Sequence, residues 1–388
     1  MSSFGGYLTI PRRMIGVSTA LVVFLVSVQF FAVGAITGEI IGDDSPIHSV
    51  PSLSSTTVIN PIYETTWKYS AQNVFPDIPG EFANATLQFR DLVTDDDGFV
   101  YVLCNAWSSY EYYEAEGIYF NYQFLVKYDS RLKIIWAVHN ENGTYGNAMT
   151  INDGYIYTTG SISTRNKETS TKVIVTKWAS NGERIWQAEW AEYYFNRGVV
   201  IAVGPDDTVY VSTEYRQLRC LDGLRKSRFL KFNSSGFLLW NKTTEVQFSI
   251  KSKLETRPDG IYSWTGIVEK RDFSCSLIWN ISRRSTAMSV DESGNVYLIE
   301  TTSQSSDFLN KFQAILSKWD ADGNRVWASN FSRELEDGCF WRFDCRSLNI
   351  APDGNLIAIF RGLDPENSYH IFKFDSGGEL SLGQNYRR

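Results

Sequence analysis

The 388-residue chain has few residues of the kinds that carry common chemistry. It contains three histidines, His48, His139 and His370, and five cysteines. The histidines are solitary, there is no nucleophile-elbow motif, and no Ser-His-Asp arrangement can be assembled from recognisable elements. No Cys-x-x-Cys sequence occurs, so no zinc or redox motif is indicated. The sequence therefore names no reaction.

The chain also lacks a basic character and long helical periodicity. Its net charge is −7 and its pI is near 5.2, which argues against a nucleic-acid partner. Between residues 86 and 388 no long stretch has clean 3.6-residue periodicity with caps. Because 43% of residues are apolar and 15% aromatic, the chain can nevertheless build a large core. These features favour an all-β fold.

A repeat dominates residues 86–388, and its best copy is Met288–Phe331. In each copy an Asp-Gly-type turn leads into a β-branched or aromatic strand, as hairpins prefer. The turns lie at Asp97-Gly98, Asp153-Gly154, Asp206-Asp207, Asp259-Gly260, Ser293-Gly294 and Asp353-Gly354.

The second half of the repeat is another hairpin, with Gly-x-x-x-Trp spacing at Gly182, Gly236 and Gly323. The expected blade tryptophans are Trp136, Trp186, Trp240, Trp279 and Trp327. Leu132 replaces the glycine before Trp136, the glycine before Trp279 is missing, and Leu382 replaces the tryptophan after Gly378. Four short strands per unit of roughly 40–50 residues are typical of β-propeller blades. We expect each tryptophan to pack between neighbouring blades.

The segments VDESGNVYL and LSKWDADGNRVW resemble the seven-bladed-type β-propeller repeats of secreted prokaryotic proteins. They are also similar to quinoprotein-like propeller repeats, which share the Gly-x-x-x-Trp element. The resemblance covers about residues 86–388 and implies a propeller outside the cytoplasm, but no catalytic residues. Six repeats are recognisable. Trp67 in ETTWKYS resembles an outer strand that could help to close the ring, so six blades are expected and seven are possible.

Residues 14–38 contain no charge and are long enough to span a bilayer as a helix. Arg12 and Arg13 precede this run, and acidic residues follow it, so the positive-inside rule places the propeller outside the cell. A single-pass membrane anchor is the first interpretation, and a cleaved signal peptide that yields a secreted protein is the alternative. The predicted domains are 1–44 (tip and anchor), 45–85 (a Ser/Thr/Pro-rich stalk) and 86–388 (propeller).

Export would permit glycosylation and disulfides. Sequons occur at Asn84, Asn142, Asn233, Asn241, Asn280 and Asn330. With this Asn and Ser/Thr content about four sequons arise by chance, so the number alone supports glycosylation weakly. Cys339 and Cys345 could close a small disulfide loop, Cys220 and Cys275 could pair, and Cys104 is expected to be a buried thiol.

The long connections all fall on one face of the predicted propeller. They are Ala106–Tyr122, Ser161–Lys172, Glu214–Ser227, Thr301–Lys311 and Arg333–Arg346. Loops on a rigid scaffold often carry binding residues. Candidate ligand or partner contacts are Trp107, Tyr110, Tyr112, Tyr113, Tyr119, Arg216, Arg219 and Arg225. The alternatives are that the aromatic residues extend strands and that the basic loop is a solvated surface.

The leading hypothesis is a binding or adhesion module for surface proteins or glycans. The alternatives are an extracytoplasmic enzyme, either a calcium-dependent hydrolase or a quinoprotein-like oxidoreductase, and an assembly scaffold of the cell envelope. No cofactor is predicted, although calcium is possible. Asp95–Gly98 and Asp320–Gly323 faintly resemble calcium loops, but both lie where hairpin turns are required, and neither supplies a complete ligand set.

Overall fold

The structure is a computed structural model. Apart from Val22–Val23 and Val33–Gly34, it describes residues 86–107, 121–131, 133–141, 143–164, 171–216, 226–245, 247–249, 252–283, 285–301, 311–334, 343–351, 353–362 and 369–386.

The described residues form six four-stranded antiparallel sheets, each built from consecutive strands. Blade 1 contains β3 (Thr86–Thr94), β4 (Val100–Trp107), β5 (Asn121–Tyr128) and β6 (Ile134–His139). Blade 2 contains β7 (Thr144–Asn152), β8 (Tyr155–Ser163), β9 (Thr171–Trp178) and β10 (Arg184–Trp190). Blade 3 contains β11 (Phe195–Val203), β12 (Val209–Arg216), β13 (Lys226–Phe232) and β14 (Leu238–Thr244).

The other three blades differ in strand length, and the strands of blade 4 are the shorter ones, with four or five residues each. Blade 4 contains β15 (Lys253–Arg257), β16 (Gly260–Trp264), β17 (Val268–Arg271) and β18 (Leu277–Ile281). Blade 5 contains β19 (Ala287–Val290), β20 (Val296–Thr301), β21 (Lys311–Trp319) and β22 (Arg325–Glu334). Blade 6 contains β23 (Phe343–Ile350), β24 (Leu356–Gly362), β25 (Tyr369–Phe374) and β26 (Leu380–Tyr386).

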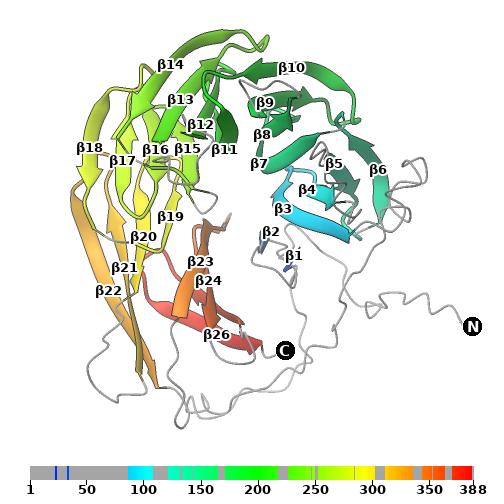
Figure 1. Cartoon of the computed structure of the whole chain (residues 1–388). Coiled ribbons are helices and arrows are strands. Elements are labelled where there is room, and N and C mark those ends of the chain that lie inside the picture. The colour runs from blue at the N-terminus through cyan, green and yellow to red at the C-terminus, as the bar shows by residue number, and fades with distance from the viewer. Residues whose placement is uncertain are drawn as a thin grey trace, which may run out of the picture.

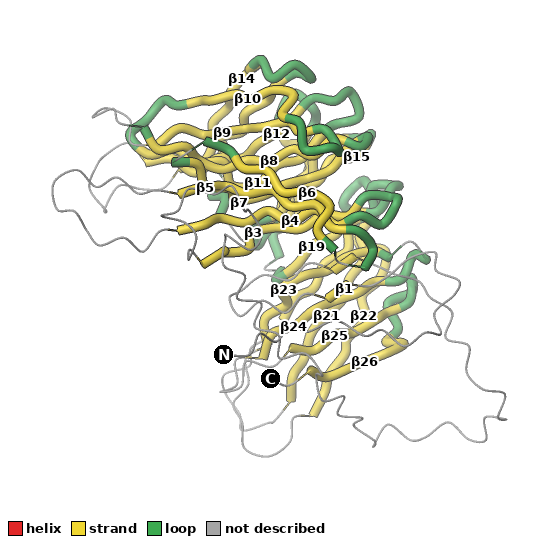
Figure 2. The backbone as a smooth tube through the Cα atoms, turned by 90° about the vertical axis from the view of Figure 1, so that its right-hand side faces the viewer, coloured by secondary structure: helices red, strands yellow, loops and turns green. Residues whose placement is uncertain are grey.

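The six sheets are arranged in an arc around a common centre, with the first strand of each blade inside and the fourth outside (Figure 1). Figure 2 shows strands joined by loops, with no helix among the described residues. This confirms the predicted all-β propeller, with six blades. We call the end of the blades with the tight first and third turns the turn face, and the opposite end the loop face.

A Tyr–Lys–Trp row crosses five of the blades. In blade 2, Tyr157 pairs with Lys177, and Lys177 pairs with Trp186 on the outer strand. The Lys177 ammonium lies 5.1 Å from the Tyr157 ring centre, and the Tyr157 and Trp186 rings are 6.3 Å apart. Similar rows are Tyr101–Lys127–Trp136, Tyr210–Lys231–Trp240, Tyr262–Lys270–Trp279 and Tyr297–Lys318–Trp327. Cation–π contacts between lysine and tyrosine, and tilted or edge-to-face contacts between tyrosine and tryptophan, hold each half-buried tryptophan in place.

Each of these rows docks on the next blade. A Cβ added to Gly236 of blade 3 would lie 2.8 Å from the Trp186 ring, so only glycine lets the ring approach this closely. The Trp186 indole also donates a hydrogen bond to the Ser234 carbonyl at 2.9 Å. The same glycine contact joins Trp136 to Gly182, Trp279 to Gly323 and Trp327 to Gly378. The predicted packing of tryptophans between blades is therefore confirmed.

Two units depart from this pattern. In blade 4 the missing glycine is replaced by Cys275, which adopts a φ of 71° and packs in one core cluster with Trp240 of blade 3. In blade 6 the corresponding row is Ile357–Lys373–Leu382, without either aromatic residue. Because Leu132 stands at the glycine position of blade 1, the aromatic–glycine dock has neither of its parts between blades 6 and 1.

The structure describes only four residues of the predicted membrane helix at residues 14–38. Val22–Val23 (β1) and Val33–Gly34 (β2) pair as short antiparallel strands, so at these four residues the predicted helix is wrong. Valine is β-branched and favours strands, which explains the difference locally. No helix in the described residues is long and apolar enough to cross a bilayer. The rest of the apolar run, the stalk and Trp67 lie outside the described residues, so the anchor stays a prediction.

The cysteine predictions have different outcomes. Cys104 is a fully buried free thiol, as expected, and burial raises its pKa to about 12. Cys275 is also a free buried thiol, so the pairing with Cys220 is wrong, because its side chain fills the space beneath Trp240 instead. Cys345 is buried in β23, but Cys339 lies outside the described residues, and their disulfide stays a prediction.

The contact between the tryptophan ring and the glycine predicts that two glycines of blade 6 differ in how much stability is lost when each is replaced by alanine. Gly378→Ala should destabilise the protein about 1–3 kcal/mol more than Gly354→Ala. Both glycines have positive φ, 85° and 77°, but a Cβ at Gly378 would lie 2.5 Å from Trp327, whereas at Gly354 nothing lies within 4 Å. Urea denaturation measures both variants. Equal losses of stability would contradict the dock.

Candidate binding site on the loop face

Bulges interrupt the pairing of four inner strands with their neighbours. The pairing of β3 with β4 shifts at Arg90, and the pairing of β11 with β12 shifts at Val199. β7 and β23 shift in the same way at Asn147 and Arg346. A bulge bends its strand and re-aims the extra residue. Arg90 therefore leaves the sheet and lies close to residues of the neighbouring blades.

Arg90, Arg197 and Arg216 form what we call the arginine cluster. Arg197 and Arg216 lie at the loop-face ends of β11 and β12. Both pair with Glu214, at 2.6 and 3.6 Å, and the Glu214 side chain is only 1% exposed. Arg90 donates to Gln88 at 2.6 Å. Two of the three positive charges thus share one buried carboxylate, and the third, Arg90, is held by a neutral amide.

Aromatic rings support these guanidinium groups. Arg90 lies 4.4 Å from the ring centre of Tyr145, and Arg216 lies 5.5 Å from that of Phe195. Arg197 lies 6.0 Å from the same Phe195 ring. A guanidinium held over a ring keeps its plane fixed and its N–H groups available at the edges. The cluster is therefore pre-organised rather than a set of loose surface chains.

The cluster carries an excess of positive charge. Burial and the nearby charge of Arg197 lower the pKa of Arg90 to about 10. The side chains of Arg197 and Arg216 are 23% and 21% exposed, so a ligand can reach them. An anion placed among the three arginines would relieve their mutual repulsion and accept charge-assisted hydrogen bonds.

A second basic and aromatic group extends the cluster along the loop face. Tyr193 and Tyr215 stack at 4.3 Å, with Arg228 at 5.6 Å from each ring centre. Arg228 is satisfied by Glu192 at 2.8 Å and by the Tyr193 hydroxyl at 3.1 Å. Because its charge is already paired, this group contributes shape and rigidity more than free charge.

Of the residues that the sequence singled out for binding, Arg216 joins this cluster. Trp107 ends β4, but its side chain is not described. The other candidates, Tyr110, Tyr112, Tyr113, Tyr119, Arg219 and Arg225, lie outside the described residues, and their roles stay predictions. Sequence reasoning missed Arg90, Arg197 and Tyr145, because isolated residues on different inner strands give no motif.

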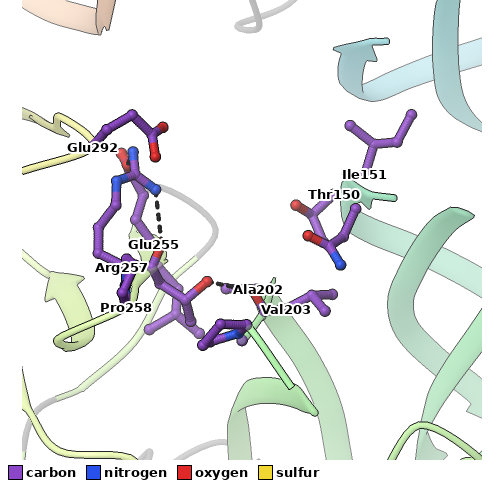
Figure 3. Close-up of a pocket in the computed structure, with 13 residues that line it drawn as sticks. Thr150, Ile151, Ala202, Val203, Glu255, Arg257, Pro258 and Glu292 are labelled. Atoms are coloured by element: carbon purple, nitrogen blue, oxygen red, sulfur yellow. Dashed lines mark hydrogen bonds and ion pairs between the residues drawn. The ribbon is translucent and has the colours of Figure 1, made fainter. Parts of the chain in front are cut away.

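A pocket of about 440 Å³ lies at the opposite, turn-face end. Its walls come from blades 2 to 5, with Thr150 and Ile151 on one side and Glu255, Arg257 and Glu292 on the other (Figure 3). The sequence did not predict this pocket, because it is lined by the tight turns that were expected to be purely structural.

The charged groups of the turn-face pocket are largely paired with one another. Glu255 binds Lys253 at 2.7 Å and Arg257 at 2.8 Å. Arg257 also donates to the carbonyls of Thr256, at 2.8 Å, and Asp291, at 2.9 Å. These contacts tie blade 4 to blade 5, so we assign this pocket a structural role before a ligand-binding one.

Metal ligation has little support among the described residues. They contain no group of three or more His, Cys, Asp or Glu side chains that could hold a metal ion. In the two segments that resemble calcium loops, Asp95 accepts from the Phe99 amide and Asp320 accepts from the Asp322 and Asn324 amides. Their carboxylates therefore close hairpin turns.

Comparisons with known proteins give a fold likeness only. No family model and no curated protein matches the chain. A puromycin hydrolase structure is 9% identical, with a TM-score of 0.43 over 76% of this chain and 53% of its own length. A Synechocystis apocarotenoid oxygenase mutant is 10% identical, with a TM-score of 0.35 over 79% of this chain and 62% of its own.

A luciferin-regenerating enzyme is 10% identical, with a TM-score of 0.36 over 78% of this chain and 94% of its own. The chain spans about half the length of the hydrolase and less than two thirds of the oxygenase. At these identities and TM-scores the likenesses carry no argument about what this chain binds or catalyses.

One inner-strand carboxyl makes stability depend on pH. Burial raises the pKa of Asp91 from 3.8 to about 6, although the Met149 and Leu92 amides and Lys253 favour its ionised form. Because the folded pKa is raised, the stability contributed by neutral Asp91 is present below about pH 4 and is lost as pH rises through 6. Asp91→Asn should remove this loss, worth up to about 3 kcal/mol.

Urea denaturation at pH 4.5 and pH 7.5 measures the change, with Asp96→Asn on an exposed turn as the control. If wild type and Asp91→Asn show the same difference between the two pH values, Asp91 does not titrate as described.

Proposed function

We propose that the protein is a binding propeller that takes a carboxylate- or sulfate-bearing glycan at the arginine cluster. The observation that carries the proposal is the gathering of three ring-supported guanidinium groups, of which Arg197 and Arg216 are paired with the buried carboxylate of Glu214. Planar guanidinium groups bind carboxylate and sulfate oxygens in pairs, which gives orientation as well as charge.

The position of the cluster supports a binding role. Arg216 is the last residue of β12, so it adjoins the long connection that follows this strand on the loop face. A ligand held at the cluster would contact the ends of β11 and β12 together. This agrees with the sequence-based expectation of a ligand or partner on the loop face, and with an exported protein that meets surface glycans. Binding to an acidic protein segment is the competing outcome for the test.

Arg90→Gln and Arg216→Gln should each weaken binding of a hexuronate oligosaccharide about tenfold, because each removes one charge-assisted contact. Arg197 is not substituted, because its loss would remove the shorter ion pair of the buried Glu214 and could disturb the fold. Arg184→Gln, on the outer strand β10, is the matched control and should bind as wild type. Isothermal titration at two salt concentrations measures affinity and its electrostatic part.

Neutral oligosaccharide and polyglutamate serve as comparison ligands. Tighter binding of the uronate than of either, with the loss confined to the cluster variants, supports the proposal. Equal affinity of all four proteins for the uronate, or preference for polyglutamate, would overturn it.

A further inference from the structure

The outer strands carry an unusual row of exposed apolar side chains. In five blades the residue just before the docked tryptophan is aliphatic and about half exposed. In blades 3, 4 and 5 these residues are Leu239, Ile278 and Val326, at 52%, 52% and 56% exposure. Outer strands are also sheet edges, whose open backbone groups invite pairing with other chains. We call these outer-strand residues the apolar rim. An exported protein with such a rim needs a means of covering it.

Three sequon asparagines lie on these same strands. Asn241 is on β14, Asn280 on β18 and Asn330 on β22, and all three are exposed. The pairing of each outer strand shifts at the exposed apolar residue itself, so closeness along the strand, rather than alternation of faces, relates that residue to the asparagine. Asn241 and Asn280 lie two residues after Leu239 and Ile278, and Asn330 lies four residues after Val326. Each asparagine is therefore exposed and close along its strand to the apolar residue that a glycan would cover.

The side-chain amides of these asparagines are available for modification. The Asn241 carbonyl oxygen accepts from Arg228 at 2.5 Å, and that of Asn280 accepts from the Ser282 hydroxyl of its own sequon at 3.2 Å. Within the described part of the chain, the Nδ2 groups of Asn241, Asn280 and Asn330 donate no hydrogen bond. An exposed amide whose nitrogen is uncommitted can accept a sugar without loss of a structural contact.

We propose that Asn241, Asn280 and Asn330 carry N-linked glycans that cover the apolar rim of blades 3, 4 and 5. In the transfer, the bond between the anomeric carbon of a lipid-linked, phosphate-activated oligosaccharide and its phosphate oxygen breaks. A bond from that carbon to Nδ2 forms, and the proton lost by Nδ2 goes to the phosphate leaving group or to solvent. No oxidation occurs. Glycans there would shield the outer edges of the three blades.

The proposal predicts an added mass on three peptides of the native protein. The full chain purified from membranes of its native cells is digested, and the peptides with Asn241, Asn280 and Asn330 are analysed by mass spectrometry. Each should carry a hexose-containing mass that peptide-N-glycosidase or chemical deglycosylation removes. Ser332→Ala should abolish the modification of Asn330, whereas Ser329→Ala on the same strand should leave it unchanged.

A second readout tests the shielding. Deglycosylated protein, or the triple variant with Thr243, Ser282 and Ser332 changed to Ala, should bind more of a hydrophobic dye and self-associate at lower concentration than the glycosylated form. Unmodified peptides at all three asparagines in the native protein would overturn the proposal. Modification without any change in dye binding or association would overturn the shielding role.

Discussion

The architecture depends on one contact, the indole ring of one blade resting on the turn of the next. A four-stranded sheet of this size cannot bury both of its faces alone, so each blade needs a neighbour on either side. The Tyr–Lys–Trp row fixes the ring, and the glycine lets the turn come close enough to touch it. The hydrogen bond from Trp186 to Ser234 adds direction to what is otherwise an apolar contact. Because the contact recurs at successive blades, it also sets the curvature of the arc.

The position of the docking rows explains where charged side chains can gather. The rows that dock the blades lie toward the turn face and the outer strands, and the middle strands supply most of the buried aliphatic residues. The loop-face ends of the first two strands of a blade take no part in this docking. They can hold polar and charged groups such as Arg197 and Glu214, provided that the groups are paired, as the buried Glu214 is. The arginine cluster is thus compatible with a stable core, and its surplus charge is the feature that packing does not explain.

Much of the fold could be predicted because its determinants are local. Asp-Gly turns and the Gly-x-x-x-Trp spacing each lie within a few residues, and they placed Trp186, Trp240 and Trp327 at equivalent positions. The spacing did not show that Trp186 contacts Gly236 of the next blade rather than Gly182 of its own hairpin. Nor did it show that Cys275 would adopt the positive φ of the missing glycine. Both facts depend on the neighbouring blade.

The candidate site was less predictable for the same reason. Arg216 was found because it begins a basic loop. Arg90 and Tyr145 are 55 residues apart in sequence and meet only when blades 1 and 2 pack, and the bulge that redirects Arg90 has no sequence signature. Recognition of such a site requires the register of the strands.

A double-mutant cycle at the interface between blades 2 and 3 tests the central claim most directly. Trp186→Leu, Gly236→Ala and the double variant are compared with wild type by urea denaturation. Since the added methyl group clashes with the indole but not with the smaller leucine, Gly236→Ala should cost at least about 1 kcal/mol less in the Trp186→Leu background. Costs that add within about 0.5 kcal/mol would contradict the account, because the ring and the glycine would then act independently.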